Sequence, residues 1–305
     1  MSFRFTLSKK HAHDYTLSLF LSNFASTKHA TYTFNNVRLC GRNNIYTKME
    51  KDKYYFVFCH GDLLLERLPD GSYTVPCGAT PPTALQDGEN MLDVAPLGDV
   101  EVKTYRISEP VATSDRYEMC GLRPSFYKLP HDLYLKAGKC EELLYWDANT
   151  KYCGVCGAPM TMHTLISKRC SACGKEVWPQ LATAIIVLVH KGDEVLLVHA
   201  RNFKGNFYGL VAGFVETGET LEEAVHREVM EETGLTITHL RYFGSQPWPY
   251  PCGLMVGFEA DYVSGNIKLQ QEELAAGAWF NRDNLPTIPE KLSIARQLID
   301  AWLSR

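Results

Sequence analysis

Residues 213–235 read GFVETGETLEEAVHREVMEETGL, and this stretch decides the fold of the C-terminal half of the chain. Thr220 followed three residues later by Glu223 is a capping box, so we expect a helix that begins at about Leu221. Gly234 suits the left-handed residue that ends such a helix. The stretch therefore predicts a capped helix with defined ends.

The predicted helix carries carboxylates on the side that faces a core. Leu221 and Val225 mark the apolar side, and steps of three or four residues reach Glu228 and Glu232, with Glu231 alongside. Like charges crowded on an inward face repel, and a hard divalent cation such as Mg²⁺, which takes oxygen ligands, relieves the repulsion. A solvated acidic face is the alternative, but it fits poorly because these acids continue the apolar stripe.

The fixed residues of this stretch match the pattern G-x5-E-x7-R-E-U-x-E-E-x-G-U at every position, where U is a bulky apolar residue. The pattern resembles the Nudix box of the Nudix hydrolases. The resemblance implies that Arg227 and Glu219 hold a loop–helix–loop in shape while later glutamates bind metal. The catalytic set it implies is Glu219, Arg227, Glu228, Glu231 and Glu232. The Mg²⁺ or Mn²⁺ ligands it implies are the Ala212 carbonyl, Glu228, Glu231, Glu232 and Glu273, with Glu231 as ligand or general base.

Length and composition limit the other possibilities. The chain has 305 residues and a formal charge of −4, enough for two domains and without a strong basic field for nucleic acid or anionic membranes. No apolar run reaches membrane-spanning length, and the N-terminal residues lack the apolar core of a signal peptide. Ten cysteines in a chain of this size favour a reducing cytosol over a secreted disulfide scaffold. We expect buried thiols at Cys40, Cys59, Cys77 and Cys120.

Four cysteines form two C-x2-C pairs, Cys153 with Cys156 and Cys170 with Cys173, separated by thirteen residues. Two such pairs are typical of a structural zinc site with four thiolate ligands and no open position for catalysis. Two disulfides or redox pairs are a weaker alternative, since a redox C-x2-C normally occurs once and opens a helix. A zinc ribbon also raises a nucleic-acid-binding interpretation, for which few basic residues are present.

Residues 245–251 read SQPWPYP, in which three prolines alternate with aromatic residues. Prolines at this density exclude a helix or a central strand, so we expect a stiff loop that projects Trp248 and Tyr250. Fixed aromatic faces beside a phosphate-cleaving site suit the stacking of a planar base. The segment resembles the array S-Q-P-W-P-F-P-x-S of the NADH pyrophosphatases, with Tyr250 in place of Phe and Gly253 in place of Ser.

The resemblance implies a mixed-sheet α/β/α Nudix sandwich, preceded by a zinc ribbon and a degenerate N-terminal Nudix-like domain. The expected boundaries are 1–125 for the box-less N-terminal domain, 126–149 for a connecting helical segment, 150–178 for the ribbon and 179–305 for the catalytic domain. Trp178 and Phe214 are expected to sandwich the nicotinamide-side ring. The other expected dinucleotide contacts are Gln246, Pro247, Trp248, Pro249, Tyr250, Pro251, Cys252, Gly253, Met255 and Ala295.

The activity implied is metal-dependent hydrolysis of NADH or NAD⁺ to nicotinamide mononucleotide and AMP by a homodimer with one structural Zn²⁺ per chain. A second activity within the same class removes NAD caps from RNA 5′ ends. A Nudix hydrolase of other nucleoside diphosphate derivatives would use the same box without needing SQPWPYP. A nucleic-acid-binding zinc-ribbon protein with an inactive box is the alternative from another class, and the complete acidic cluster argues against it.

Overall fold

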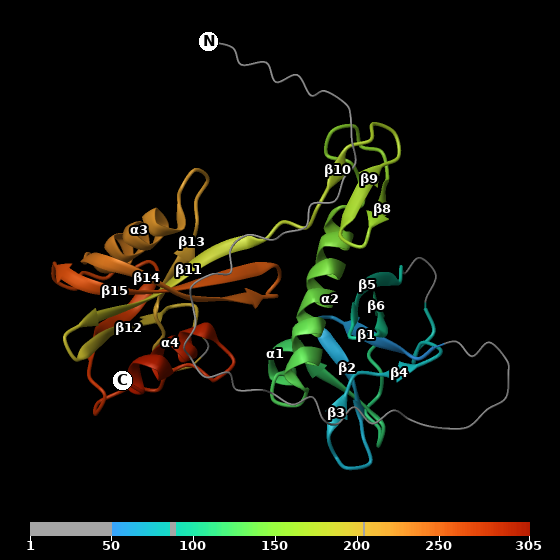
Figure 1. The fold of residues 1–305 in the computed structure, drawn as a ribbon, viewed down its shortest axis with the longest axis horizontal. Coiled ribbons are helices and arrows are strands. Elements are labelled where there is room, and N and C mark those ends of the chain that lie inside the picture. The colour runs from blue at the N-terminus through green and yellow to red at the C-terminus, as the bar shows by residue number, and fades with distance from the viewer. Residues whose placement is uncertain (1–50, 86–89, 204) are drawn as a thin grey trace, which may run out of the picture. The chain divides into compact units, whose positions relative to one another are not determined.

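The computed structural model describes residues 51–85, 90–203 and 205–305, and Figure 1 labels their helices and most of their strands. Cys40 lies outside the described residues. Two mixed sheets, a small three-stranded sheet and four helices make up the described chain. Among the described helices, none has the length and apolar character needed to cross a membrane.

The C-terminal sheet is built around one apolar strand. Its strand order is β14-β15-β11-β12-β16, with β13 also paired to β11. β11 runs parallel to β15 and antiparallel to β12 and β13. The bounds are β11 Ala182–Lys191, β12 Glu194–Ala200, β13 Val211–Phe214, β14 Thr236–Trp248, β15 Gly253–Ser264 and β16 Leu274–Phe280.

Alternate residues of β11 enter two different cores. Ile185 and Val187 pack with α3 (Leu221–Thr233), whereas Ile186 and Leu188 pack with α4 (Ile294–Leu303). The two helices therefore cover opposite faces of the sheet (Figure 1). The continuous apolar run Thr183–His190 predicts a strand buried on both faces, as observed, and the expected α/β/α sandwich with a mixed sheet is confirmed.

The N-terminal sheet has the order β3-β2-β1-β6-β5, with β4 paired to β1 and β7 paired to β2. The residues of β1 that point to one face pack against the long helix α2, the expected helical segment, which spans His131–Asn149. The short helix α1, Leu122–Ser125, precedes it. The strand bounds are β1 Lys53–Cys59, β2 Asp62–Arg67, β3 Tyr73–Thr74, β4 Cys77–Gly78, β5 Leu92–Leu97, β6 Val100–Arg106 and β7 Tyr117–Gly121.

The pairings of the two large sheets correspond strand by strand. β1 is antiparallel to β2 and β4 and parallel to β6, as β11 is to β12, β13 and β15. β7 pairs with β2 as β16 pairs with β12, and β5 pairs with β6 as β14 pairs with β15. The described residues between β4 and β5 contain no counterpart of α3.

The cysteine pairs lie in a three-stranded sheet of the order β10-β9-β8, with bounds β8 Met160–Thr164, β9 Ser167–Cys170 and β10 Glu176–Val177. This small sheet is fixed to the end of α2 by Lys168, which is almost fully buried. Its Nζ donates to the Asp147 carbonyl at 2.8 Å and pairs with the Asp147 carboxylate at 2.8 Å. A buried ammonium needs such partners because desolvation of an unpaired charge is costly.

Two local expectations are corrected. Ser245–Trp248 is not a loop but the end of β14, an edge strand, which tolerates Pro247 because one side of an edge strand needs no ladder hydrogen bond. The C-terminal helix α4 begins at Ile294, where the Ser293 hydroxyl caps it by accepting from the Arg296 N–H. Cys59 and Cys120 are buried as expected, but Cys77 is exposed.

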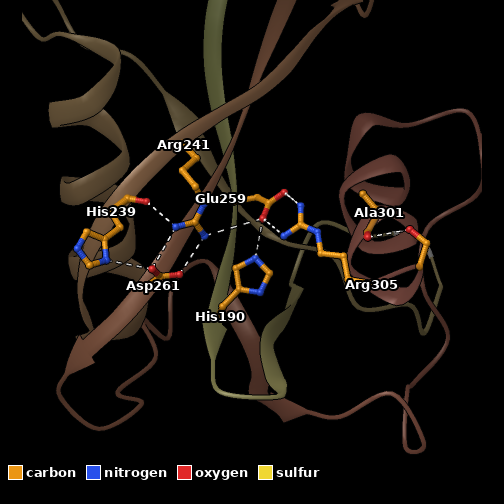
Figure 2. A network of polar contacts seen from close by, with 8 residues as sticks. His190, His239, Arg241, Glu259, Asp261, Ala301 and Arg305 are labelled. Carbon is orange, nitrogen blue, oxygen red and sulfur yellow. Dashed lines mark hydrogen bonds and ion pairs between the residues drawn. The ribbon is translucent and has the colours of Figure 1, made fainter. Parts of the chain in front are cut away.

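Figure 2 shows a polar network that holds the end of α4 to the sheet. The Glu259 carboxylate, on β15, is almost fully buried and accepts two hydrogen bonds from the Arg305 guanidinium, at 2.5 and 2.8 Å. His190 Nε2, on β11, lies 2.9 Å from the same carboxylate. Arg241 connects Glu259 to Asp261 at the exposed edge. These partners balance a charge that would otherwise be costly to bury.

Candidate active site

The capping box of α3 is present as predicted. The Thr220 hydroxyl accepts from the Glu223 N–H at 3.1 Å, and the Thr220 N–H donates to the Glu223 carboxylate at 2.8 Å. Gly234 ends the helix with φ of 69°, and its N–H donates to the Met230 carbonyl. The helix is therefore fixed at both ends by residues that the sequence alone identifies.

Arg227 connects the helix to the loop that precedes it. Its guanidinium donates to the Glu219 carboxylate at 2.5 and 2.9 Å, and it also donates to the Phe214 carbonyl at 2.9 Å. This double hydrogen bond holds the pKa of Glu219 down to about 2, helped by the Glu216 N–H. Arg227 also reaches Glu228 at 2.9 Å. It therefore orients the loop and one inward-facing acid together.

Glu228 and Glu232 are the acids that face the protein interior, with exposed fractions of 9% and 4%. Burial raises the pKa of Glu228, and it raises the pKa of Glu232 to about 8, with Glu228 and Glu273 adding like-charge repulsion. Gly213 makes room for Glu228, because a Cβ at Gly213 would lie 2.0 Å from the Glu228 carboxylate. The box therefore requires glycine at position 213, because the Glu228 carboxylate lies against the backbone there.

Glu231 departs from the expected inward cluster. Its side chain is 55% exposed and accepts a hydrogen bond from Arg227 at 3.0 Å, one turn earlier on α3. The helical period explains the difference, because a residue between Glu228 and Glu232 is rotated away from the face that those two share. The inward pair is therefore Glu228 and Glu232.

A cavity of about 300 Å³ receives Glu232, whereas Glu228 is not part of its lining. Its lining includes the Ala212 segment of β13, Glu232 and Glu273, with Glu272 and Arg201 nearby on the wall. One carboxylate oxygen of Glu232 is buried with no hydrogen-bond partner among the described residues. A divalent cation that takes carboxylate oxygens would satisfy this oxygen and offset the repulsion that raises its pKa. The residues present therefore fit the metal expected of the box.

A second cavity of about 1030 Å³ adjoins the first, and the two share Asn202, Phe203, Leu210 and Ala212 in their walls. Three of the predicted dinucleotide contacts, Trp248, Met255 and Ala295, line the larger cavity. The guanidinium of Arg123, from α1, lies 5.3 Å from the centre of the Trp248 ring and lines the same wall. A mostly apolar cavity beside an acidic one suits a ligand with planar rings and a charged centre.

Other predicted contacts of the SQPWPYP segment lie elsewhere. The Gln246 side chain donates to the Leu292 carbonyl and accepts from the Ile294 N–H, both at 2.7 Å, so it joins β14 to the start of α4. Tyr250 packs against the N-terminal core, with its hydroxyl 3.2 Å from that of Tyr134. The predicted dinucleotide contacts that line neither described cavity are Trp178, Phe214, Gln246, Pro247, Pro249, Tyr250, Pro251, Cys252 and Gly253.

Gly253 takes the place of the serine in the family array, and strand pairing limits the space for a side chain there. Its φ is not in the left-handed region, so the loop has not been reshaped around a positive φ. A Cβ here would lie 2.9 Å from the Trp248 carbonyl oxygen and 3.3 Å from the Trp248 Cβ, because Gly253 pairs with Trp248 where β14 meets β15. A side chain at Gly253 therefore requires the strand end to shift.

The larger cavity also contains residues that the sequence motifs do not identify. The segment between β12 and β13 supplies several of them. The sequence feature that could have identified this segment is its polar, glycine-containing composition directly before the box. Residues 287–294, before and at the start of α4, supply most of the others, and Arg123 of α1 and Ile186 of β11 complete the set. The added residues are Arg123, Ile186, Asn202, Phe203, Gly205, Asn206, Phe207, Gly209, Leu210, Thr287, Ile288, Pro289, Glu290, Ser293 and Ile294.

The four cysteines of the small sheet converge as their spacing predicts. Their sulfur atoms all lie within 4.8 Å of one another. The N–H groups of Cys173 and Ala172 point at the Cys170 sulfur and lower its pKa to about 6, while those of Val155 and Cys156 lower the pKa of Cys153. N–H groups that stabilise thiolates are what a four-sulfur metal site requires.

Comparison with known proteins agrees with this geometry. Residues 178–302 match the NUDIX domain family, so the fold and the acidic site define a Nudix hydrolase domain. The chain is 42% identical over 188 residues to the NAD-capped RNA hydrolase NudC of Stutzerimonas stutzeri, covering 61% of this chain and 67% of that protein. It is also 42% identical over 188 residues to NudC of Klebsiella pneumoniae, covering 61% and 72% respectively.

The chain belongs to the NADH pyrophosphatase family of the Nudix hydrolases. It spans about two thirds of the length of these relatives, and as little as 63% for NudC of one Pseudomonas aeruginosa strain. The structure also resembles a crystal structure of a NUDIX hydrolase from Nitrosomonas europaea, with a TM-score of 0.44 and 19% identity, covering 51% of this chain and 91% of that one.

Proposed function

We propose that this enzyme hydrolyses the diphosphate of NADH or NAD⁺ to nicotinamide mononucleotide and AMP, and that it removes NAD caps from RNA 5′ ends by cleaving the same bond. The observation that carries the proposal is the junction of two cavities, one acidic and one apolar, at Ala212 and Phe203. A dinucleotide matches this arrangement, because its charged diphosphate suits the acidic cavity with a bound cation and its planar bases suit the apolar cavity. The relatives named NAD-capped RNA hydrolase support the choice of substrate.

In the proposed reaction, water attacks one phosphorus of the diphosphate, the bridging P–O bond breaks, and the water proton passes to a carboxylate or to solvent. Glu228, Glu232 and Glu273, with the Ala212 carbonyl, would hold Mg²⁺ or Mn²⁺. The bound cation supplies charge neutralisation of the diphosphate and a more acidic water. Arg227 holds Glu228 in place and binds Glu231 on the exposed side, where Glu231 can receive a proton.

We further propose that the four cysteines bind one structural Zn²⁺ and that residues 150–178 form a ribbon without a catalytic role. Thiolate ligands require reduced cysteines, which is consistent with a cytosolic enzyme.

We also propose that the N-terminal domain is a Nudix-like domain without a box, because its strand pairings match those of the C-terminal sheet. We further propose that the enzyme is a homodimer. The exposed rings of Trp178 and Phe214 lie outside both described cavities, and a second subunit would give them a partner.

Product analysis tests the function directly. NADH, NAD⁺ and a short NAD-capped RNA are incubated with the enzyme at matched Mg²⁺ or Mn²⁺, and products are separated by chromatography. We expect AMP and nicotinamide mononucleotide from the free dinucleotides and a 5′-monophosphate RNA from the capped transcript. Comparable turnover of ADP-ribose and diadenosine polyphosphates, with little on the three NAD substrates, would contradict the proposal in favour of a different nucleoside diphosphate substrate.

A further inference from the structure

Two phenylalanine rings are stacked in the segment that joins β12 to β13. The centroids of Phe203 and Phe207 are 4.4 Å apart, and the ring planes differ by 14°. Both side chains are half-buried, which leaves part of each ring at the surface. Near-parallel rings at this separation form a flat apolar surface that is stiffer than either ring alone.

The pair lies at the junction of the two cavities. Phe203 lines the cavity that contains Glu232 and Glu273 as well as the larger apolar cavity, whereas Phe207 lines the larger one. Trp248 contributes a third ring to the larger cavity. A planar group bound here would therefore lie next to the acids and still be enclosed by aromatic surface.

Two neighbouring residues, His199 on β12 and Gly209, support the pair. His199 Nδ1 donates to the Phe207 carbonyl at 2.8 Å, and the His199 ring meets Phe203 edge-on with centroids 5.9 Å apart. Gly209 has no side chain where a Cβ would lie 3.2 Å from the Phe203 ring. Contacts from a strand residue and the space left by a glycine fix the rings in one orientation, which stacking on a ligand requires.

We propose that the Phe203–Phe207 pair is a binding surface for a planar heteroaromatic ring of the substrate. The inference rests on the proposed function, because a diphosphate held at the acids places one base of a dinucleotide beside them. The ring is either nicotinamide or adenine, which share flatness and a polarisable face. This surface is distinct from Trp178 and Phe214, whose rings are 55% and 65% exposed and line neither described cavity.

The test uses Phe203→Leu and Phe207→Leu, which keep an apolar side chain but remove the ring face. The matched control is Tyr242→Leu, since Tyr242 is an exposed ring that lines neither described cavity. Steady-state kinetics with NADH and inhibition by AMP and nicotinamide mononucleotide are measured for each protein. Thermal midpoints verify folding, and Phe203→Tyr, which restores a ring, should rescue the kinetics.

Loss of a stacking surface should raise KM for NADH on the order of ten-fold while kcat changes little. Weaker inhibition by AMP alone would identify the ring as adenine, and weaker inhibition by nicotinamide mononucleotide alone would identify it as nicotinamide. Unchanged KM in both leucine variants would overturn the proposal. A fall in kcat at constant KM would also overturn it, because the pair would then shape the acidic cavity rather than bind a ring.

Calorimetric titration with AMP and with nicotinamide mononucleotide separates this inference from the function it rests on. Binding of either compound needs no turnover, so it is measured even if the wild-type protein does not hydrolyse NADH. If the protein does not hydrolyse NADH but its binding of AMP or nicotinamide mononucleotide depends on Phe203, only the proposed function is contradicted. If the protein hydrolyses NADH but wild type and both leucine variants bind AMP and nicotinamide mononucleotide with equal affinity, only the proposed ring-binding surface is contradicted.

Discussion

At the scale of single residues, the chemistry centres on Glu232. It is almost fully buried, one of its oxygens has no partner among the described residues, and its pKa is raised to about 8 by burial first and then by Glu228 and Glu273. Replacement by Gln keeps the shape and removes the charge. We therefore expect Glu232→Gln to abolish most of the turnover at saturating Mg²⁺ while leaving the fold intact. Activity and thermal midpoint measured on the same preparation test this.

The same residue gives a pH dependence with a definite sign. A carboxyl whose folded pKa is raised above its ordinary value of 4.5 holds its proton more tightly when folded, so stability falls as pH rises from about 4.5 to about 8. One such group contributes a slope of at most about 1.4 kcal/mol per pH unit. Thermal unfolding in buffer without Mg²⁺ or Mn²⁺ should show this decline, and Glu232→Gln should reduce it. Glu231→Gln, at an exposed position, is the control.

Gly213, in the box, and Gly244, on β14 outside both cavities, differ in the space available for a side chain. Gly213→Ala would place a methyl group 2.0 Å from the Glu228 carboxylate, so we expect a loss of activity of at least ten-fold as Glu228 is displaced. Gly244→Ala is the control, because a Cβ there meets nothing within 4 Å. Kinetics of the two variants at saturating Mg²⁺ provide the comparison. Equal activities would show that Glu228 can move without cost.

Gly253→Ser tests the departure from the family array. Sequence alone favours an added hydrogen bond and an improved affinity for NADH. A Cβ at Gly253 would lie only 2.9 Å from the Trp248 carbonyl oxygen, which instead predicts a strained strand end, with KM raised and thermal midpoint lowered. A lower KM with an unchanged midpoint would restore the sequence-based expectation.

At the scale of elements, the ribbon is the unit that depends on metal. Structural zinc contributes directly to folding, with apparent binding free energies of about 10 kcal/mol or more in small modules. We expect one Zn²⁺ per chain and a marked fall in thermal midpoint for Cys153→Ser, whose sulfur belongs to the four-sulfur cluster. Metal analysis of reduced, active protein checks the stoichiometry. Active protein without zinc would exclude the assignment.

At the scale of the whole molecule, the Glu259 network fixes the far end of the helix whose first turn lines the larger cavity. Ala295 lies in that first turn, whereas Arg305 follows the last turn and binds Glu259. Arg305→Ala should lower the free energy of unfolding by about 1–3 kcal/mol, because a buried carboxylate loses its strongest donor. Denaturant unfolding measures the effect. A variant as stable as wild type would mean that His190 and Arg241 suffice.

The features that rest on short spacings could be predicted from the amino-acid sequence. A capping box, a terminal glycine and an Arg–Glu pair act within one loop and helix, and two C-x2-C pairs bring their sulfurs together through local turns. Such interactions are encoded by neighbouring residues, so their geometry follows from the order of the chain.

Which side chains share a cavity depends on contacts between residues that are distant in the sequence. Glu231 turns outward although it belongs to the box, Tyr250 packs against Tyr134, and Phe203 joins the two cavities from a segment without a motif. Gly253 is restricted by the register between β14 and β15. These outcomes depend on strand pairing and packing between residues distant in sequence, and the free energy of that packing is set by the whole fold rather than by any local pattern.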